Sequence, residues 1–189
     1  MRKLIVQQWV TADAIAAEED GGLGFVSGEP FSEEDTSAFK ADLMGFIDSV
    51  DTMVLGATTY RQNRDYWPQA EDQGEYGEKL NRLAKVVASS TLDEAPWGDF
   101  PAATVTRDPV ETIRGLKEQP GRDLWLWGSL TLLRTLQEAG VVDEYRMLLC
   151  PTTRGTGRRL FEDRQDLRLL EATAYDNGVA LLRYGGGDR

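Results

Sequence analysis

Histidine is absent from this chain of 189 residues. Its absence excludes the Ser-His-Asp and Cys-His arrangements of nucleophilic catalysis, histidine general bases and most zinc sites. Carboxylates alone can bind metal ions, but the acidic residues form no tight DxD or ExxE cluster on an apolar scaffold. We therefore expect no metal site.

Cysteine is scarce, because Cys150 is the only one in the chain. A lone cysteine cannot form an internal disulfide, which is typical of proteins from a reducing compartment. Cys150 follows the apolar residues 147–149 at an expected strand end. This context favours a buried, inert thiol over a nucleophile.

Long apolar runs are missing as well, and none approaches the roughly 18 residues that a membrane span requires. The apolar segment at 3–10 is too short and too polar for a signal peptide, and no small-residue cleavage site follows it. We expect a cytoplasmic protein without a membrane partner.

Basic residues are outnumbered by acidic ones, 21 to 32, and the net charge is −11. Nucleic-acid binding requires a basic face, and none is visible in the sequence, so we expect no nucleic-acid partner. The acidic residues are spread along the chain, which is typical of a solvated surface. An anionic small molecule would therefore be held locally, by backbone N–H groups, hydroxyls and a few arginines.

The sequence alternates between strand-like and helix-like segments, and its length fits a single domain over residues 1–189. Strands are expected at 3–10, 51–56, 85–89, 103–106, 122–127 and 142–150. Helices are expected from 32 to about 50, from 57, from 109 to 117 and from 129 to 139, with 61–80 polar and irregular. Segments 167–175 and 179–184 flank Asp176-Asn-Gly178, a hairpin signal. The order predicts an α/β fold with a mainly parallel central sheet, helices on both faces and an antiparallel C-terminal hairpin.

Gly128-Ser129 separates an apolar strand-like run, 124–127, from a helical pattern. The apolar residues after this pair keep helical spacing, namely Leu130, Leu133, Leu136 and Ala139. N–H groups at the start of a helix lack partners and carry partial positive charge, and Gly128 has no side chain to keep an anion away. A phosphate or pyrophosphate fits such a turn. The alternative is an ordinary strand-to-helix turn in which glycine only eases packing.

Small or hydroxyl-bearing residues end three expected strands, at Gly56, Ser89-Ser90 and Gly128-Ser129. In open α/β sheets, ligands bind at the carboxyl ends of the strands. Three strand ends of this kind indicate a nucleotide-binding groove more strongly than a single strand end does. The loop from about 11 to 30 is long for a compact domain, and loops of that length are usually functional.

Motifs along nearly the whole chain resemble the dihydrofolate reductase-like superfamily. The resemblance is greatest to the branch with the reductase domain of bifunctional riboflavin-biosynthesis proteins and its stand-alone bacterial relatives. The order and spacing of the motifs carry the resemblance, since each alone is modest. They are Asp51-Thr-Met-Val-Leu-Gly-Ala-Thr-Thr-Tyr60 with Tyr66-Trp-Pro68, Lys85-Val-Val-Ala-Ser-Ser-Thr-Leu92, Gly128-Ser-Leu-Thr-Leu-Leu133, and Val142-Asp-Glu-Tyr-Arg146 followed by Pro151, Gly155-Thr-Gly157 and Leu160-Phe161.

The resemblance implies a reductase that transfers hydride from NADPH to a small heterocycle such as a pyrimidine or a pterin. Dihydrofolate reductase and 5-amino-6-(5-phosphoribosylamino)uracil reductase are the activities of this type. Homodimers are common among these relatives, so a homodimer is one expectation. The alternative is a non-catalytic dinucleotide-binding module that acts as a sensor or carrier.

The resemblance also implies a set of cofactor-binding residues at the three strand ends. The first segment would start a helix under the phosphates, the second would bind the adenosine, and the third would hold the pyrophosphate. These residues are Gly56, Thr58 and Thr59, then Ser89 and Ser90, then Gly128, Ser129, Leu130 and Thr131.

Two departures from the family pattern stand out. Ala57 replaces an arginine that in the family helps to hold the 2′-phosphate of NADPH, and alanine cannot form that charge-assisted pair. Either Arg61 or Arg107 compensates, or the protein uses NADH. The second departure is Ala14, which replaces a glycine after the retained Asp13.

Hydride transfer to a C=N or C=O group requires a proton donor, and without histidine a carboxylic acid, a tyrosine or water must serve. Asp35 is one candidate, because residues 35–40 resemble a dihydrofolate reductase motif whose aspartate faces the pterin. The alternative is that Asp35 only caps a helix that opens at Ser32. Asp13 is the second candidate, and its alternative is a turn aspartate that bonds its own backbone.

Tryptophans and arginines complete the candidate list. Trp9 and Trp67 are expected to flank a planar substrate, with Trp67 at the pocket mouth, whereas Trp125 and Trp127 are expected to pack in the core. The loop after Pro151 carries arginines that would meet a substrate phosphate or a neighbouring subunit, or would simply be solvated. They are Arg154, Arg158 and Arg159.

Overall fold

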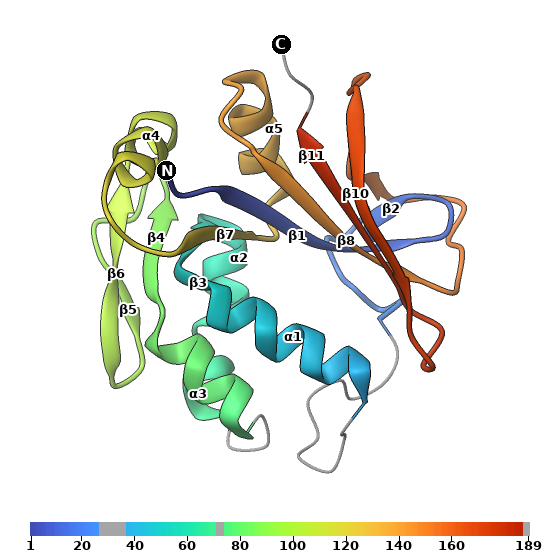
Figure 1. Cartoon of the computed structure of the whole chain (residues 1–189). Coiled ribbons are helices and arrows are strands. Elements are labelled where there is room, and N and C mark those ends of the chain that lie inside the picture. Colours follow the sequence, from blue (N-terminus) through green and yellow to red (C-terminus); the bar gives the residue numbers. More distant parts are fainter. Residues whose placement is uncertain (27–36, 71–73, 187–189) are drawn as a thin grey trace.

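The computed structural model describes residues 1–26, 37–70 and 74–186. Its main sheet has nine strands in the order β10-β11-β8-β1-β7-β3-β4-β6-β5 (Figure 1). Their bounds are β1 Leu4–Thr11, β3 Val50–Gly56, β4 Ala84–Ala88, β5 Ala95–Trp97, β6 Phe100–Thr106, β7 Asp123–Trp127, β8 Glu144–Cys150, β10 Leu167–Ala174 and β11 Ala180–Gly186. Two short strands, β2 Ile15–Ala17 and β9 Arg158–Arg159, form a separate sheet.

The central strands are parallel, from β8 through β1, β7, β3 and β4 to β6. Antiparallel strands close both edges, β5 beside β6 and the β10–β11 hairpin beside β8. The predicted fold class, a mainly parallel sheet with an antiparallel C-terminal hairpin, is therefore confirmed. Because parallel strands end at the same edge of a sheet, the ends of β1, β3, β4 and β7 lie together.

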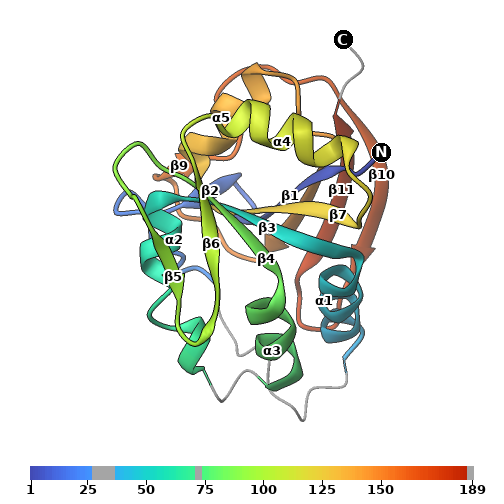
Figure 2. The same cartoon turned by 90° about the vertical axis from the view of Figure 1, so that its left-hand side faces the viewer.

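Helices cover both faces of the sheet (Figure 2). The helices α4 and α5 lie on one face, and α1 and α3 lie on the other. Their bounds, with α2 and the 3-10 helix η1, are α1 Ala38–Ser49, α2 Ala57–Asn63, η1 Trp67–Gln69, α3 Gly74–Arg82, α4 Pro109–Glu118 and α5 Leu130–Glu138. No helix in these described ranges is both long and apolar enough to span a membrane.

The sheet separates two hydrophobic cores, because successive side chains of a strand point to opposite faces. Strand β7 shows this directly: Leu124 and Leu126 belong to the core under α4 and α5, and Trp125 belongs to the core with Phe39 and Phe46 of α1. Each of these residues except Phe46 is at most 2% exposed. Burial on both faces explains why the strand sequence is almost continuously apolar.

Two helix starts test the sequence signals. Helix α4 begins as predicted, with Pro109 in its first turn and the Asp108 carboxylate accepting a hydrogen bond from the Glu111 N–H at 3.1 Å. Helix α1 begins at Ala38, where the Ser37 hydroxyl accepts from the Lys40 N–H at 3.2 Å. The start predicted at Ser32 lies outside the described residues.

The expectation that 61–80 is irregular is wrong, since α2 extends to Asn63 and η1 and α3 follow it. Helix α3 contains Gly74 and Gly77, which are poor helix formers. It forms because it buries Tyr76 and Leu80 against the core under α1. Strand β5 and the β2–β9 pair were also not expected, because each is only two or three residues long.

Candidate functional site

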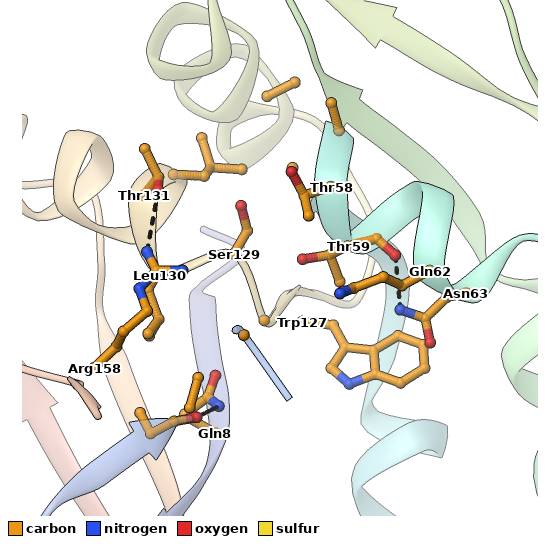
Figure 3. A pocket seen from close by; sticks show the side chains of 18 of the residues that line it. Gln8, Thr58, Thr59, Gln62, Asn63, Trp127, Ser129, Leu130, Thr131 and Arg158 are labelled. Carbon is orange, nitrogen blue, oxygen red and sulfur yellow. Dashed lines mark hydrogen bonds between the residues drawn. The ribbon is translucent and has the colours of Figure 1, made fainter. Parts of the chain in front are cut away.

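A cavity of about 880 Å³ lies where β1, β3, β4 and β7 end (Figure 3). This volume is in the range of small-molecule and cofactor sites. The structure brings together all the residues that were predicted to bind a cofactor, since each of them lines this cavity. They are Gly56, Thr58, Thr59, Ser89, Ser90, Gly128, Ser129, Leu130 and Thr131.

The ends of β3 and β7 touch at Gly56 and Ser129. A Cβ atom at Gly56 would lie 1.9 Å from the Ser129 Oγ, so the contact requires glycine. Gly128 and Ser129 both adopt left-handed φ values, 66° and 61°. For a serine this conformation costs roughly 1–2 kcal/mol, and such strain is typically retained at functional sites.

Ser129 is the residue before α5, yet its side chain makes no capping hydrogen bond. The Leu133 N–H closes the first turn by donating to the Ser129 carbonyl at 2.9 Å. The preceding N–H groups, from Leu130 to Leu132, therefore have no partner within the helix. Because these residues line the cavity, its wall carries the positive end of the α5 dipole.

Ser89 and Arg107 form the part of the cavity beyond β4. The Ser89 Oγ accepts from the N–H groups of Thr91 and Leu92 at 3.1 and 3.0 Å. Arg107 donates to the Ser89 carbonyl at 2.5 Å and to the Asp93 carboxylate at 3.1 Å. Of the two arginines considered as substitutes for the missing family arginine, Arg107 lines the cavity and Arg61 does not.

Amide and indole side chains line the remaining wall. Gln62 and Trp127 lie across the cavity from Gln8 and Arg158 (Figure 3). The Trp127 ring stacks on Trp125, with centroids 5.1 Å apart and planes at 24°. Trp127, which was predicted to pack in the core, thus also faces the cavity.

The two tryptophans predicted to flank a substrate lie in different environments. Trp9 lines the cavity and packs edge-on against Phe39 at 5.8 Å. Trp67 does not lie at the cavity mouth, which corrects the prediction. It is 6% exposed, its Nε1 donates to the Asn63 Oδ1 at 3.0 Å, and its ring packs edge-on against Trp127 at 5.4 Å. A large ring buries more apolar area in this position than at an open mouth.

Of the two candidate proton donors, Asp35 lies outside the described residues, and Asp13 is not among those that line the cavity. Asp13 accepts from the Thr11 hydroxyl at 2.5 Å and from the N–H groups of Gly155 and Arg154 at 2.7 and 3.2 Å. The Thr11 hydroxyl first, and then the Gly155 N–H, lower the pKa of Asp13. An ionised carboxylate that holds a loop is poorly suited to donate a proton, which corrects the candidate role of Asp13.

The three arginines after Pro151 have separate environments. Arg154 pairs with Glu18 at 3.2 Å, Arg159 is exposed, and Arg158 lines the cavity. Sequence reasoning did not identify several polar lining residues, since isolated amides give no pattern. They are Gln7, Gln8, Gln62 and Asn63.

Charged side chains are few among the described residues of the cavity wall. They are Asp20, Arg107 and Arg158. Their balance is one positive charge, in a chain whose net charge is −11. Together with the start of α5, they make the cavity the natural place for an anionic ligand.

The chain matches the model of a known protein family, and its fold is similar to those of solved structures. The RibD C-terminal domain family model matches residues 2–181. The uncharacterized protein YyaP of Bacillus subtilis (strain 168) is 30% identical over 192 aligned positions, which cover 97% of this chain and 94% of YyaP.

Two solved structures share the fold at low sequence identity. A pyrimidine reductase-like protein from Corynebacterium diphtheriae has a TM-score of 0.67 and 17% identity, with 100% of this chain and 93% of that chain covered. The dihydrofolate reductase of Enterococcus faecalis, complexed with NADP(H), has a TM-score of 0.58 and 14% identity, with 98% and 97% covered.

Proposed function

Because this chain belongs to the RibD C-terminal domain family, we propose that it is an NADPH-dependent reductase of small planar heterocycles, pyrimidine- or pterin-like. The observation that carries the proposal is the cavity at the ends of β3, β4 and β7. It combines small residues, free helix N–H groups and a locally positive wall with two indole rings.

Each part of the cavity has a role in this proposal. Gly128 leaves the backbone open to phosphate oxygens, which the first N–H groups of α5 bind. The Ser89 and Ser90 hydroxyls bind the adenosine. The bound cofactor supplies the hydride, and the protein supplies binding, orientation and exclusion of water.

In this proposal the substrate binds beside Trp9, Trp127 and Gln62, which line the cavity. Indole faces stack on planar heterocycles, and an amide offers both a donor and an acceptor to a heterocycle edge.

Asp35 stays the proposed proton donor, with water as its alternative. Among the described residues that line the cavity, Asp20 is the only carboxylate, and its Oδ1 accepts from the Gly22 N–H at 2.8 Å.

Selection of NADPH over NADH is assigned to Arg107. Ala57 has no charge to offer a 2′-phosphate, whereas the Arg107 guanidinium lies beside Ser89 in the same wall. A guanidinium pairs with phosphate through strong, charge-assisted hydrogen bonds. Asp93 holds Arg107 in place and also offsets part of its charge, so the preference for NADPH should be moderate.

The test has two stages. NADPH and NADH are first titrated by quenching of tryptophan fluorescence, and oxidation of the bound dinucleotide is then followed with a panel of pyrimidines and pterins. Binding with turnover supports the proposal. Binding without turnover on a broad panel favours the alternative, a dinucleotide sensor or carrier. Absence of binding to either dinucleotide contradicts both.

A further inference from the structure

Two short strands form a flap over one side of the cavity. We define the flap as residues 11–17 and 152–159, which contain β2 and β9. In this sheet, Ile15 pairs with Arg159 and Ala17 pairs with Arg158. The flap contributes Ala16, Ala17 and Arg158 to the cavity wall. Arg158 lies across the cavity from Gln62 and Trp127 (Figure 3).

Asp13 joins the two segments of the flap. Its carboxylate accepts from the N–H groups of Arg154 and Gly155, which belong to the other segment, and from the Thr11 hydroxyl in its own. The Ala12 N–H also donates to the Thr152 carbonyl at 2.8 Å. Because its ionised carboxylate accepts two N–H groups of the other segment, Asp13 links the segments through charge-assisted hydrogen bonds.

Close packing extends this link towards the cavity. Gly157 has a φ of 134°, and a Cβ atom there would lie 2.5 Å from the Ile15 Cγ2 and 2.6 Å from the Ala17 carbonyl oxygen. The second segment therefore passes directly against the first at the residue before Arg158. The position of Arg158 depends on how the two segments are held together.

Arg158 extends from the flap to the first turn of α5. Its Nη2 lies 3.4 Å from the Thr131 Oγ1 (Figure 3). Across the described ranges of the chain, Arg158 forms no ion pair, whereas Arg154 pairs with Glu18. A guanidinium and a helix N-terminus thus border the same cavity, and both favour an anion.

We propose that Asp13 is a positioning residue that acts through the flap to hold Arg158 against the pyrophosphate of a bound dinucleotide. This inference rests on the proposed function. It replaces a catalytic role for Asp13 with a structural one, and it assigns the cofactor phosphates, rather than a substrate phosphate, as the partner of Arg158.

A double-mutant cycle on NADPH affinity tests the coupling, with no substrate present. The variants are Asp13→Asn, Arg158→Gln and their combination, and the control is Arg159→Gln, an exposed neighbour on the same strand. Each single variant is expected to raise the Kd about 10-fold, the loss of one charge-assisted contact. The double variant should bind no more weakly than Arg158→Gln alone, because Asp13 acts through Arg158. The control should bind as wild type does.

The outcomes separate this inference from the proposed function. Wild-type NADPH affinity in Arg158→Gln overturns the inference, as do losses that add in the double variant. If the wild-type protein binds neither NADPH nor NADH, the proposed function itself fails. Thermal unfolding of each variant checks its fold. If Asp13→Asn does not fold, Thr11→Ala, which removes a hydrogen bond to Asp13, takes its place in the cycle.

Discussion

Gly128 is the residue on which the proposed phosphate-binding site at the start of α5 depends most directly. Its φ is +66°, and a Cβ atom there would lie 3.1 Å from the Thr59 Cγ2. Gly128→Val would add a β-branched side chain to a strained conformation at the cavity wall. We expect NADPH affinity to fall by more than about 10-fold, measured as Kd.

Gly140 provides the matched control for this variant. It has the same φ of +66°, but nothing lies within 4 Å of the place that a Cβ atom would take there. Gly140→Val should therefore lose a similar amount of stability without losing affinity. An unchanged Kd for NADPH in Gly128→Val would contradict the proposed phosphate-binding site.

Residue 57 provides a gain-of-function test. Ala57→Arg restores the family arginine in the cavity wall, where it would add a second guanidinium to the one from Arg107. The ratio of the Kd for NADH to the Kd for NADPH should rise, and Arg107→Gln should lower it. Both ratios follow from the same fluorescence titrations. If neither variant changes the ratio, the 2′-phosphate does not bind at this end.

At the scale of the element, the junction between α3 and β4 has an unusual cation. The Lys85 Nζ donates to the carbonyls of Leu80, Asn81 and Leu83 at 3.3, 2.8 and 2.8 Å, and so occupies the end of α3. It also lies 4.8 Å from the centroid of the Trp97 ring. Burial lowers the pKa of Lys85 to about 8.

This shift predicts how stability depends on pH. Between pH 8 and the ordinary lysine pKa of 10.5, the unfolded chain holds a proton that folded Lys85 has released, so stability rises with pH. The free energy of unfolding should increase by about 2 kcal/mol from pH 8 to pH 10. Above pH 10, Tyr76 has the opposite effect on stability. Burial raises its pKa, so the tyrosine stays neutral in the folded protein while it ionises in the unfolded chain. The free energy of unfolding therefore falls as pH rises further.

Denaturant unfolding at several pH values measures this profile. In Lys85→Met the rise between pH 8 and 10 should disappear, whatever the stability of that variant at neutral pH. A flat wild-type profile would show that the three carbonyls keep Lys85 charged.

Elements with local signals were predictable, and elements that depend on distant partners were not. Asp108-Pro109 and Asp176-Asn-Gly178 fix a helix start and a turn through their own backbone preferences. Helix α3 forms despite Gly74 and Gly77, because its apolar side chains are buried by η1 and α1. Local propensity is too weak to reveal such a helix.

At the scale of the whole molecule, the candidate site follows from topology. Parallel strands bring Gly56, Ser89 and Gly128 to one edge of the sheet, so the strand ends in the sequence were enough to predict which residues line the cavity. The flap was not predictable, because the pairing of β2 with β9 joins segments far apart in the sequence. The same limit applies to Trp67 and Trp127, whose positions are decided by packing between elements rather than by strand alternation alone.

A dinucleotide that binds the folded chain across several strand ends should stabilise the whole molecule. At a free NADPH concentration about 100 times the Kd, the free energy of unfolding should rise by about 2.7 kcal/mol. Thermal unfolding with and without NADPH measures the effect, and Gly128→Val, with its weaker binding, serves as the control. An unfolding temperature that NADPH leaves unchanged in the wild type would contradict binding to the folded state.

The contact between Gly56 and Ser129 has an evolutionary consequence. A Cβ atom at Gly56 would lie only 1.9 Å from the Ser129 hydroxyl oxygen, so the space between these positions can hold a side chain from only one of them. Relatives that carry alanine at the first position should carry glycine at the second, so the pair is expected to covary across the family. A change from Gly56 with Ser129 to alanine with glycine requires two substitutions. The intermediate would contain either an unfilled cavity, with glycine at both positions, or a steric clash, with alanine and serine together.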